Sequence, residues 1–162
     1  MVDPMFEIPT RIALGADHNG VILKEDLKQD LVRKGFSCTD FGPFHPDIKV
    51  DYVDFAYEVA QAVATGNADF GILVCGTGVG MSIAANKIAS IRAALVHNLL
   101  TAKKSREHNN ANILCLGVWI NDTATNLLIA ETWIREPFGG ERHIKRIAKL
   151  DQLDEKLLNL KR

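Results

Sequence analysis

One cysteine of this sequence stands in a segment suited to acid–base chemistry. Cys75 ends the apolar run 70–75, and the turn GTGVG at positions 76–80 follows it directly. The turn precedes a predicted helix, so its backbone N–H groups form a nest that stabilises a bound phosphate or an oxyanion. The dipole of that helix favours the thiolate form of Cys75. The alternative is a buried structural cysteine at the end of a core strand.

The turn differs from the common nucleotide-binding loops. It lacks the lysine of a phosphate-binding P-loop, and its glycines at 76, 78 and 80 do not have the spacing of GxGxxG. The case for nucleotide binding is therefore weak.

Two histidines and two arginines are further candidates, each with a structural alternative. His108, near the end of a predicted helix, can act as a general acid or base, or its charge can suit the helix dipole. His18 and Asp17 can form a pair that orients a ligand. Alternatively, one of the two caps the helix that follows and its neighbour is solvated. Arg142 and Arg146 are four apart, so on a helix both can bind one phosphate or form a solvated cationic face.

The elements that position these residues alternate along the chain, which predicts a parallel sheet with helices on both faces. Predicted strands cover residues 11–16, 36–41, 70–75, 92–97 and 112–117; predicted helices cover 21–35, 52–65, 99–108 and 121–136, and another opens at 81–87. Strand 70–75 is the most apolar and is expected at the centre. Ligands bind at the carboxyl ends of such strands, where Asp17, Cys75 and His97 follow three of them.

The last segment predicts a long helix with a broad apolar stripe. From Ile144 onward, apolar residues recur every three or four positions, and Leu158 widens the stripe. Such a helix can lie on its own domain or pack against a second subunit, and the second arrangement is favoured here. We expect a short tail at residues 1–10 and one domain at residues 11–162.

Composition excludes several functional classes. Hydrophobic residues make up 47% and charged residues 24% of the 162 residues, as in ordinary globular domains. The formal net charge of −1 argues against general nucleic-acid binding, and no apolar run approaches the roughly 20 residues of a membrane helix. The first ten residues lack the pattern of a signal peptide. Cys38, Cys75 and Cys115 are too few and scattered for a disulfide framework or zinc site, so we expect a cytoplasmic protein without a metal.

Five segments together resemble the type B ribose-5-phosphate isomerase family, which also includes galactose-6-phosphate and allose-6-phosphate isomerases. The segments are GADHNG at 15–20, DYVDFA at 51–56, ILVCGTGVGMSIAANK at 72–87, REHNNANILCLG at 106–117 and PFGGERHIKRI at 137–147. The resemblance implies an α/β fold, a Rossmann-like three-layer α/β/α sandwich with a five-stranded parallel sheet. It also implies a homodimer or homotetramer whose active sites lie between subunits.

The resemblance further implies roles for individual residues. Cys75 would be the base that moves a proton between C1 and C2 of a sugar phosphate, with Thr77 as its hydroxyl neighbour and His108 promoting ring opening. One base suffices for this proton transfer, so no cofactor is expected. The residues implied to bind substrate are Asp17, His18, Tyr52, Gly76, Gly78, Val79, Gly80 and Asn109, and those implied to hold the phosphate are Arg142 and Arg146. Some relatives carry a glutamate at or near position 79, where this chain has no carboxylate.

The sequence departs from the family pattern at two positions. Most members have an arginine, a phosphate or substrate ligand, where this chain has Trp119. A tryptophan can stack on a sugar face or narrow the pocket. Val53 replaces a usual proline, which we expect to be harmless.

The expected activity is therefore interconversion of ribose 5-phosphate and ribulose 5-phosphate. The alternatives are isomerisation of another sugar phosphate, such as allose 6-phosphate, galactose 6-phosphate or a tetrose phosphate, and a non-catalytic Rossmann-like binding module. A thiol hydrolase or redox enzyme is disfavoured, because no second cysteine lies near Cys75 in sequence and nothing suggests a Cys–His–Asx triad.

Overall fold

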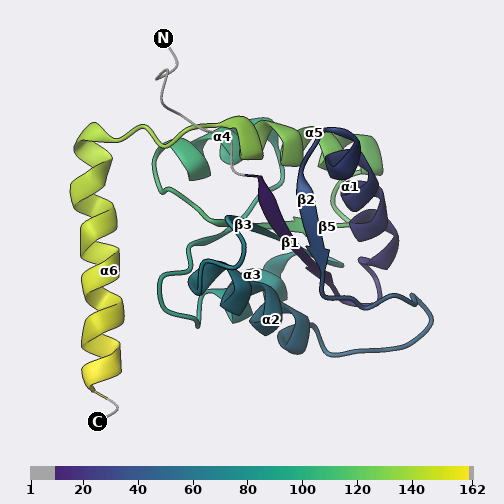
Figure 1. The fold of residues 1–162 in the computed structure, drawn as a ribbon, viewed down its shortest axis with the longest axis horizontal. Coiled ribbons are helices and arrows are strands. Elements are labelled where there is room, and N and C mark those ends of the chain that lie inside the picture. Colours follow the sequence, from purple (N-terminus) through teal and green to yellow (C-terminus); the bar gives the residue numbers. More distant parts are fainter. Residues whose placement is uncertain (1–9, 161–162) are drawn as a thin grey trace.

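Five strands pair in parallel in the order β2-β1-β3-β5-β4, and the three inner strands are runs of almost entirely buried, mostly apolar residues. The computed structural model describes residues 10–160 (Figure 1). The strands are β1 (Arg11–Ala16), β2 (Ser37–Asp40), β3 (Phe70–Cys75), β4 (Ala93–Leu95) and β5 (Ile113–Gly117). The helices are α1 (Val21–Arg33), α2 (Tyr52–Ala64), α3 (Val79–Ala85), α4 (Leu99–Glu107), α5 (Thr123–Arg135) and α6 (Ile144–Asn159), with a 3-10 turn, η1 (Glu141–His143), before α6.

The sheet has a hydrophobic core on each face, because alternate side chains of a strand point to opposite sides. Leu14 and Ile72 pack with α1, α4 and α5 on one face, where Trp133 is the largest buried side chain. Leu73 and Cys115 pack with α2 and α3 on the other face. The predicted three-layer α/β/α sandwich is confirmed.

Strand β3 occupies the centre of the sheet, as its composition predicts. All six of its residues are buried, and it pairs with β1 on one side and with β5 on the other. A strand covered on both faces requires a continuous apolar run rather than an alternating one.

Several boundaries differ from the prediction by one or two residues, and the differences at β4 and α3 have a clear structural cause. Strand β4 has three residues rather than six, because it lies at the sheet edge and pairs with β5 alone. Helix α3 begins at Val79, two residues earlier than predicted, because Gly78 takes a left-handed conformation with φ of 79° and completes the turn at that point. The predicted cap of α5 is confirmed, since the Asp122 side chain accepts a hydrogen bond from the Thr125 N–H.

Helix α6 stands beside the domain (Figure 1). Most of the residues of its apolar stripe are exposed. Ile147 is its one buried residue, whereas Leu150, Leu153 and Leu157 are 42%, 52% and 57% exposed. The predicted long helix is therefore present, and its stripe is not packed against the domain of the same chain. Packing against a second subunit stays a prediction.

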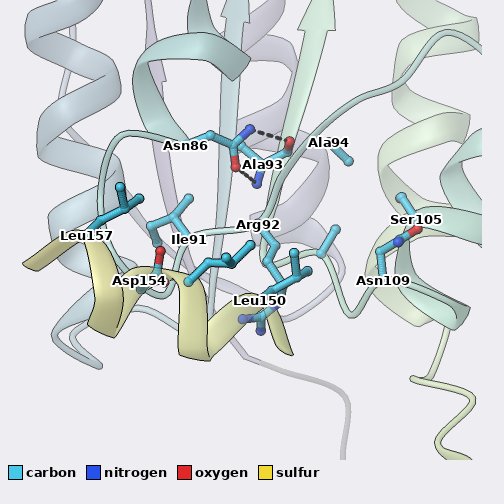
Figure 2. Close-up of a pocket in the computed structure, with 12 residues that line it drawn as sticks. Asn86, Ile91, Arg92, Ala93, Ala94, Ser105, Asn109, Leu150, Asp154 and Leu157 are labelled. Carbon is cyan, nitrogen blue, oxygen red and sulfur yellow. Dashed lines mark hydrogen bonds between the residues drawn. The ribbon is translucent and has the colours of Figure 1, made fainter. Parts of the chain in front are cut away.

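Two polar contacts attach α6 to the segment that precedes β4. The Ser90 N–H donates to Asp154 Oδ2 at 2.7 Å, and Arg92 Nη1 lies 3.6 Å from Asp151 Oδ1. A cavity of about 500 Å³ lies between this segment and α6 (Figure 2). Leu150 and other stripe residues line one side of it, so the cavity continues the uncovered apolar surface.

The predicted tail at residues 1–10 lies outside the described residues except for Thr10. Within residues 10–160, no helix is long and apolar enough to cross a membrane.

Candidate active site

Cys75 lies at the carboxyl end of the central strand, where the chain turns into α3. Its side chain is 6% exposed, and the backbone N–H of Gly78 donates to its Sγ at 3.0 Å. The Cys75 sulfur therefore accepts a hydrogen bond from the turn that follows it. Cys75 thus has the core position of a structural cysteine together with a donor that suits a base.

The turn 76–80 is held by contacts with the loop that follows β5. The N–H groups of Val118 and Trp119 donate to the carbonyls of Cys75 and Gly76 at 3.0 and 2.9 Å. A Cβ atom at Gly117 would lie 2.7 Å from the backbone of Thr77, so the two loops approach more closely than any residue with a side chain permits.

Two N–H groups of the predicted anion nest already have partners within the chain. The N–H of Gly78 is directed to Cys75, and the N–H of Val79 donates to Thr77 Oγ1 at 3.3 Å. The Thr77 hydroxyl is therefore fixed beside the start of α3. These two N–H groups are thus directed to Cys75 and Thr77, and the nest that remains for an anion is smaller than predicted.

Two aromatic rings lie against glycines of this turn. A Cβ atom at Gly76 would be 2.6 Å from the Trp119 ring, and one at Gly80 would be 2.9 Å from the Tyr52 ring. Trp119 is nevertheless 68% exposed and Tyr52 38% exposed. Both rings therefore pack on glycine backbone and keep part of their surface exposed to solvent.

A buried ion pair holds the segment that leads from β2 toward Tyr52. Lys24 Nζ donates to Asp40 Oδ1, and the same oxygen accepts the Gly42 N–H at 2.9 Å. Burial by itself raises the pKa of Asp40, but the hydrogen bonds from Lys24, Gly42 and Lys28 outweigh it and hold the pKa below its usual range. The Asp40 carboxylate thus anchors the start of this segment.

Asp17 and His18 follow β1 at the same edge of the sheet as Cys75. Asp17 is 7% exposed, and its backbone N–H donates to the Val74 carbonyl at 3.0 Å, next to Cys75. Its Oδ1 accepts the N–H groups of Asn19 and Gly20 at 2.9 and 3.1 Å, so the carboxylate stabilises the turn before α1.

The ring of His18 bridges the turn before α1 and the segment before α2. Its Nδ1 is 3.5 Å from the Val50 N–H, and its Nε2 is 3.4 Å from Asn19 Nδ2. The structure thus assigns the turn-capping role to Asp17 and leaves His18 partly exposed beside it.

His108 and Asn109 lie at the opposite edge of the sheet from Cys75, where the strands begin. Helix α4 connects the end of β4 to the start of β5, so it runs antiparallel to the strands and its last residues lie where β5 begins. Cys75 instead pairs with Gly117 at the end of β5, and the five residues of that strand span about 13 Å. Within one chain, the structure does not bring His108 and Asn109 to Cys75.

Arg142 and Arg146 lie on the side of His108. The His143 ring stacks on the His108 ring, with centroids 4.4 Å apart and an interplanar angle of 15°. Both arginines are exposed, and Arg146 belongs to α6 itself. The predicted residues therefore form two groups, with Cys75 in one and His108 in the other.

Arg106 fixes the turn that carries His108, a role that the sequence did not reveal. Its side chain is buried and donates to Asn110 Oδ1 at 2.9 Å and to the Ala111 carbonyl at 2.6 Å. The guanidinium lies 4.5 Å from the centre of the Phe70 ring. Burial lowers the pKa of Arg106 to about 10, which still leaves it charged at neutral pH. An arginine on a helix surface has no sequence signal that distinguishes this role.

Within residues 10–160, no group of three or more His, Cys, Asp or Glu side chains is placed to hold a metal ion.

Comparisons with known proteins give one consistent family. Residues 12–150 match the family model described as Ribose/Galactose Isomerase. A putative sugar phosphate isomerase of Bacillus subtilis is 40% identical over 148 residues, which are 91% of this chain and 99% of the relative. Ribose-5-phosphate isomerase B of Escherichia coli is 39% identical over 146 residues, which are 90% of this chain and 97% of the relative.

Solved structures show the same similarity in three dimensions. The ribose-5-phosphate isomerase B of Clostridium thermocellum is 43% identical with a TM-score of 0.89, over 91% of this chain and 99% of that one. The enzyme of Mycoplasma genitalium with bound ribulose 5-phosphate is 39% identical with a TM-score of 0.87, over 92% of this chain and 99% of that one. The similarity covers nearly the whole chain in sequence and in fold.

The geometry around the three cysteines predicts their order of alkylation. We expect iodoacetamide at neutral pH to modify Cys75 first, because the backbone N–H of Gly78 is directed at its sulfur. Burial raises the pKa of the Cys38 thiol to about 11 and that of Cys115 still further, so both stay protonated. Peptide mass spectrometry over time measures the order, and a Cys75→Ser variant should lose the fast phase. Modification of Cys38 before Cys75 would contradict the assignment.

Proposed function

The chain belongs to the ribose/galactose isomerase family, and from that premise we propose that it interconverts ribose 5-phosphate and ribulose 5-phosphate. Relatives of about 40% identity are ribose-5-phosphate isomerases B, and one solved relative holds ribulose 5-phosphate. The observation that carries the proposal is the Gly78 N–H donated to Cys75 Sγ at the end of the central strand. It directs a hydrogen-bond donor at the proposed base, at the end of the sheet where an open parallel sheet binds its ligand.

In the proposed reaction, the Cys75 thiolate removes the proton from C2 of the open-chain aldose and returns it to C1. The electron pair of the C2–H bond forms the C1–C2 double bond, and the π pair of the carbonyl group moves to O1, which gives an enediolate. The hydroxyl proton passes from O2 to O1, and Thr77 provides a hydroxyl beside Cys75 for this transfer. Backbone N–H groups of residues 76–80 other than those of Gly78 and Val79 stabilise the negative oxygen, a contribution worth about 10²–10³ in rate for one donor.

The sugar arrives mostly as a closed ring, so a second acid–base group is needed. We assign ring opening to His108, substrate oxygens to Asn109, and the phosphate to Arg142 and Arg146. The phosphate is remote from the bonds that change, so binding it positions the reacting end of the sugar. Asp17, His18 and Tyr52 line the part of the pocket next to Cys75.

We further propose that each active site combines the Cys75 group of one chain with the His108 group of a second copy. One chain places these groups at opposite edges of its sheet, which supports a shared site. The uncovered stripe of α6 supports the pairing, because an exposed apolar surface of this extent marks an interaction site. Since Arg146 lies on α6, packing of α6 on a partner carries this arginine toward the partner. A homodimer is the simplest such assembly, and a homotetramer contains the same pair.

A cytoplasmic location suits this mechanism, because the thiol of Cys75 must stay reduced to act as a base.

A different sugar phosphate is the second candidate substrate, and Trp119 is the observation that favours it. Its exposed ring covers Gly76, next to Cys75, at a position where the family pattern places an arginine. A ring at this point offers a flat apolar surface to a sugar in place of a cation to a phosphate.

Removal of the Cys75 thiol should abolish most of the activity. We expect Cys75→Ala to lower kcat for ribose 5-phosphate by about 10²–10⁴-fold, the usual contribution of a general base. The matched control Cys38→Ala should keep the wild-type rate, because Cys38 lies on the edge strand β2. A coupled assay with ribose 5-phosphate, allose 6-phosphate and galactose 6-phosphate measures both the effect and the substrate. Full activity of Cys75→Ala would exclude the proposed base, and an inactive wild type on all three sugars would favour a binding module.

Restoring a cation beside Gly76 should strengthen phosphate binding. We expect Trp119→Arg to lower KM for ribose 5-phosphate several-fold, up to about tenfold, because a guanidinium forms charge-assisted hydrogen bonds to phosphate. Trp119→Phe is the control, since it keeps an aromatic ring and adds no charge. Steady-state kinetics distinguish the two variants, and an unchanged or raised KM for Trp119→Arg would show that this position does not face the phosphate.

A further inference from the structure

His143 is a buried ring that lies between two residues of the proposed site. We propose that it is a positioning residue, which holds the His108 ring by stacking and the Arg142 guanidinium by a hydrogen bond. The inference rests on the proposed function, because it concerns the groups assigned to ring opening and phosphate binding.

The stacking contact joins a fixed ring to an accessible one. His143 is 6% exposed, whereas the side chain of His108 is 33% exposed. The rings are nearly parallel, at 15°, with centroids 4.4 Å apart. The buried ring of His143 therefore limits the orientations open to the His108 ring that substrate would meet.

The backbone keeps His143 in this place. The Gly139 N–H donates to the Glu107 carbonyl at 2.9 Å, and the His143 N–H donates to the Gly140 carbonyl at 2.9 Å. A Cβ atom at Gly139 would lie 2.9 Å from the Glu107 carbonyl oxygen. The segment before α6 is thus docked on the end of α4, immediately next to His108.

The second contact defines which nitrogen of His143 carries a proton. Arg142 Nε lies 3.4 Å from His143 Nε2, and a guanidinium only donates, so Nε2 is the acceptor. A neutral ring then carries its proton on Nδ1. This nitrogen is buried and has no hydrogen-bond partner among residues 10–160, so it does not reach a ligand. His143 therefore acts through its neighbours rather than on the substrate.

The surroundings keep His143 neutral. Burial is the largest influence that lowers its pKa, and the charges of His108, Arg142 and Arg146 lower it further, while Glu107 opposes them. A neutral partner matters to His108, because two protonated rings stacked at this distance would repel each other.

Two substitutions separate the two contacts. His143→Phe keeps a ring beneath His108 but removes the acceptor for Arg142, whereas His143→Gln keeps an acceptor and removes the ring. We expect His143→Phe to raise KM for ribose 5-phosphate up to about tenfold with kcat near wild type. We expect His143→Gln to lower kcat up to about tenfold with KM near wild type, because loss of orientation weakens acid–base catalysis.

Proton NMR of the folded proteins tests the same contacts without turnover. The ring-current shift of the His108 ring protons should be present in wild type and in His143→Phe and absent in His143→Gln. Titration with inorganic phosphate should show weaker binding to His143→Phe alone. These readouts stand even if wild type does not isomerise ribose 5-phosphate, an outcome that would contradict the proposed function by itself.

The positioning role would be overturned if both variants changed kcat and KM to the same extent, or if both behaved like wild type. Thermal melting of each variant shows whether it is folded. If a variant does not fold, the wild-type spectrum decides, since a His108 ring without a ring-current shift is not stacked on His143.

Discussion

In a parallel sheet, the carboxyl ends of all strands lie along one edge and their amino ends lie along the opposite edge. The arrangement of the functional residues in this protein follows from that constraint. Residues that follow β1, β3 and β5 meet at one edge, which brings Asp17, Cys75 and Trp119 together. Helix α4 must return the chain to the other edge, so His108 ends there. Two groups with complementary chemistry are therefore separated by the length of the strands.

The two groups differ in the charge that they stabilise. At the carboxyl edge, backbone N–H groups and glycine contacts surround a buried sulfur and suit a small, dispersed negative charge. At the other edge, exposed guanidinium groups and stacked histidines suit a doubly charged phosphate and proton exchange. A sugar phosphate requires both kinds of charge stabilisation, because its reacting carbons are at one end of the molecule and its phosphate is at the other. An assembly that joins opposite edges of two chains meets both.

Local sequence patterns predicted much of this architecture. The apolar run of β3 indicated a strand buried on both faces, and the glycines after Cys75 indicated a tight turn, because both properties belong to a few neighbouring residues. The contact between Trp119 and Gly76 could not be predicted in this way, because it depends on how β5 pairs with β3. The same holds for His143 and His108, which 34 intervening residues separate in the chain. Strand β4 was predicted too long, because its length is limited by its pairing with β5 alone as the outermost strand of the sheet, and the local sequence does not show this position.

Whether catalysis needs both groups from different chains is decided most directly by mixing two inactive variants. Cys75→Ala and His108→Ala each lack one half of every site, and a mixed dimer regains one intact site only if the halves come from different chains. After co-refolding in equal amounts, random pairing predicts recovery of about one quarter of wild-type activity. Native mass spectrometry confirms that mixed dimers form. Mixed dimers without activity above that of either variant would contradict the shared site.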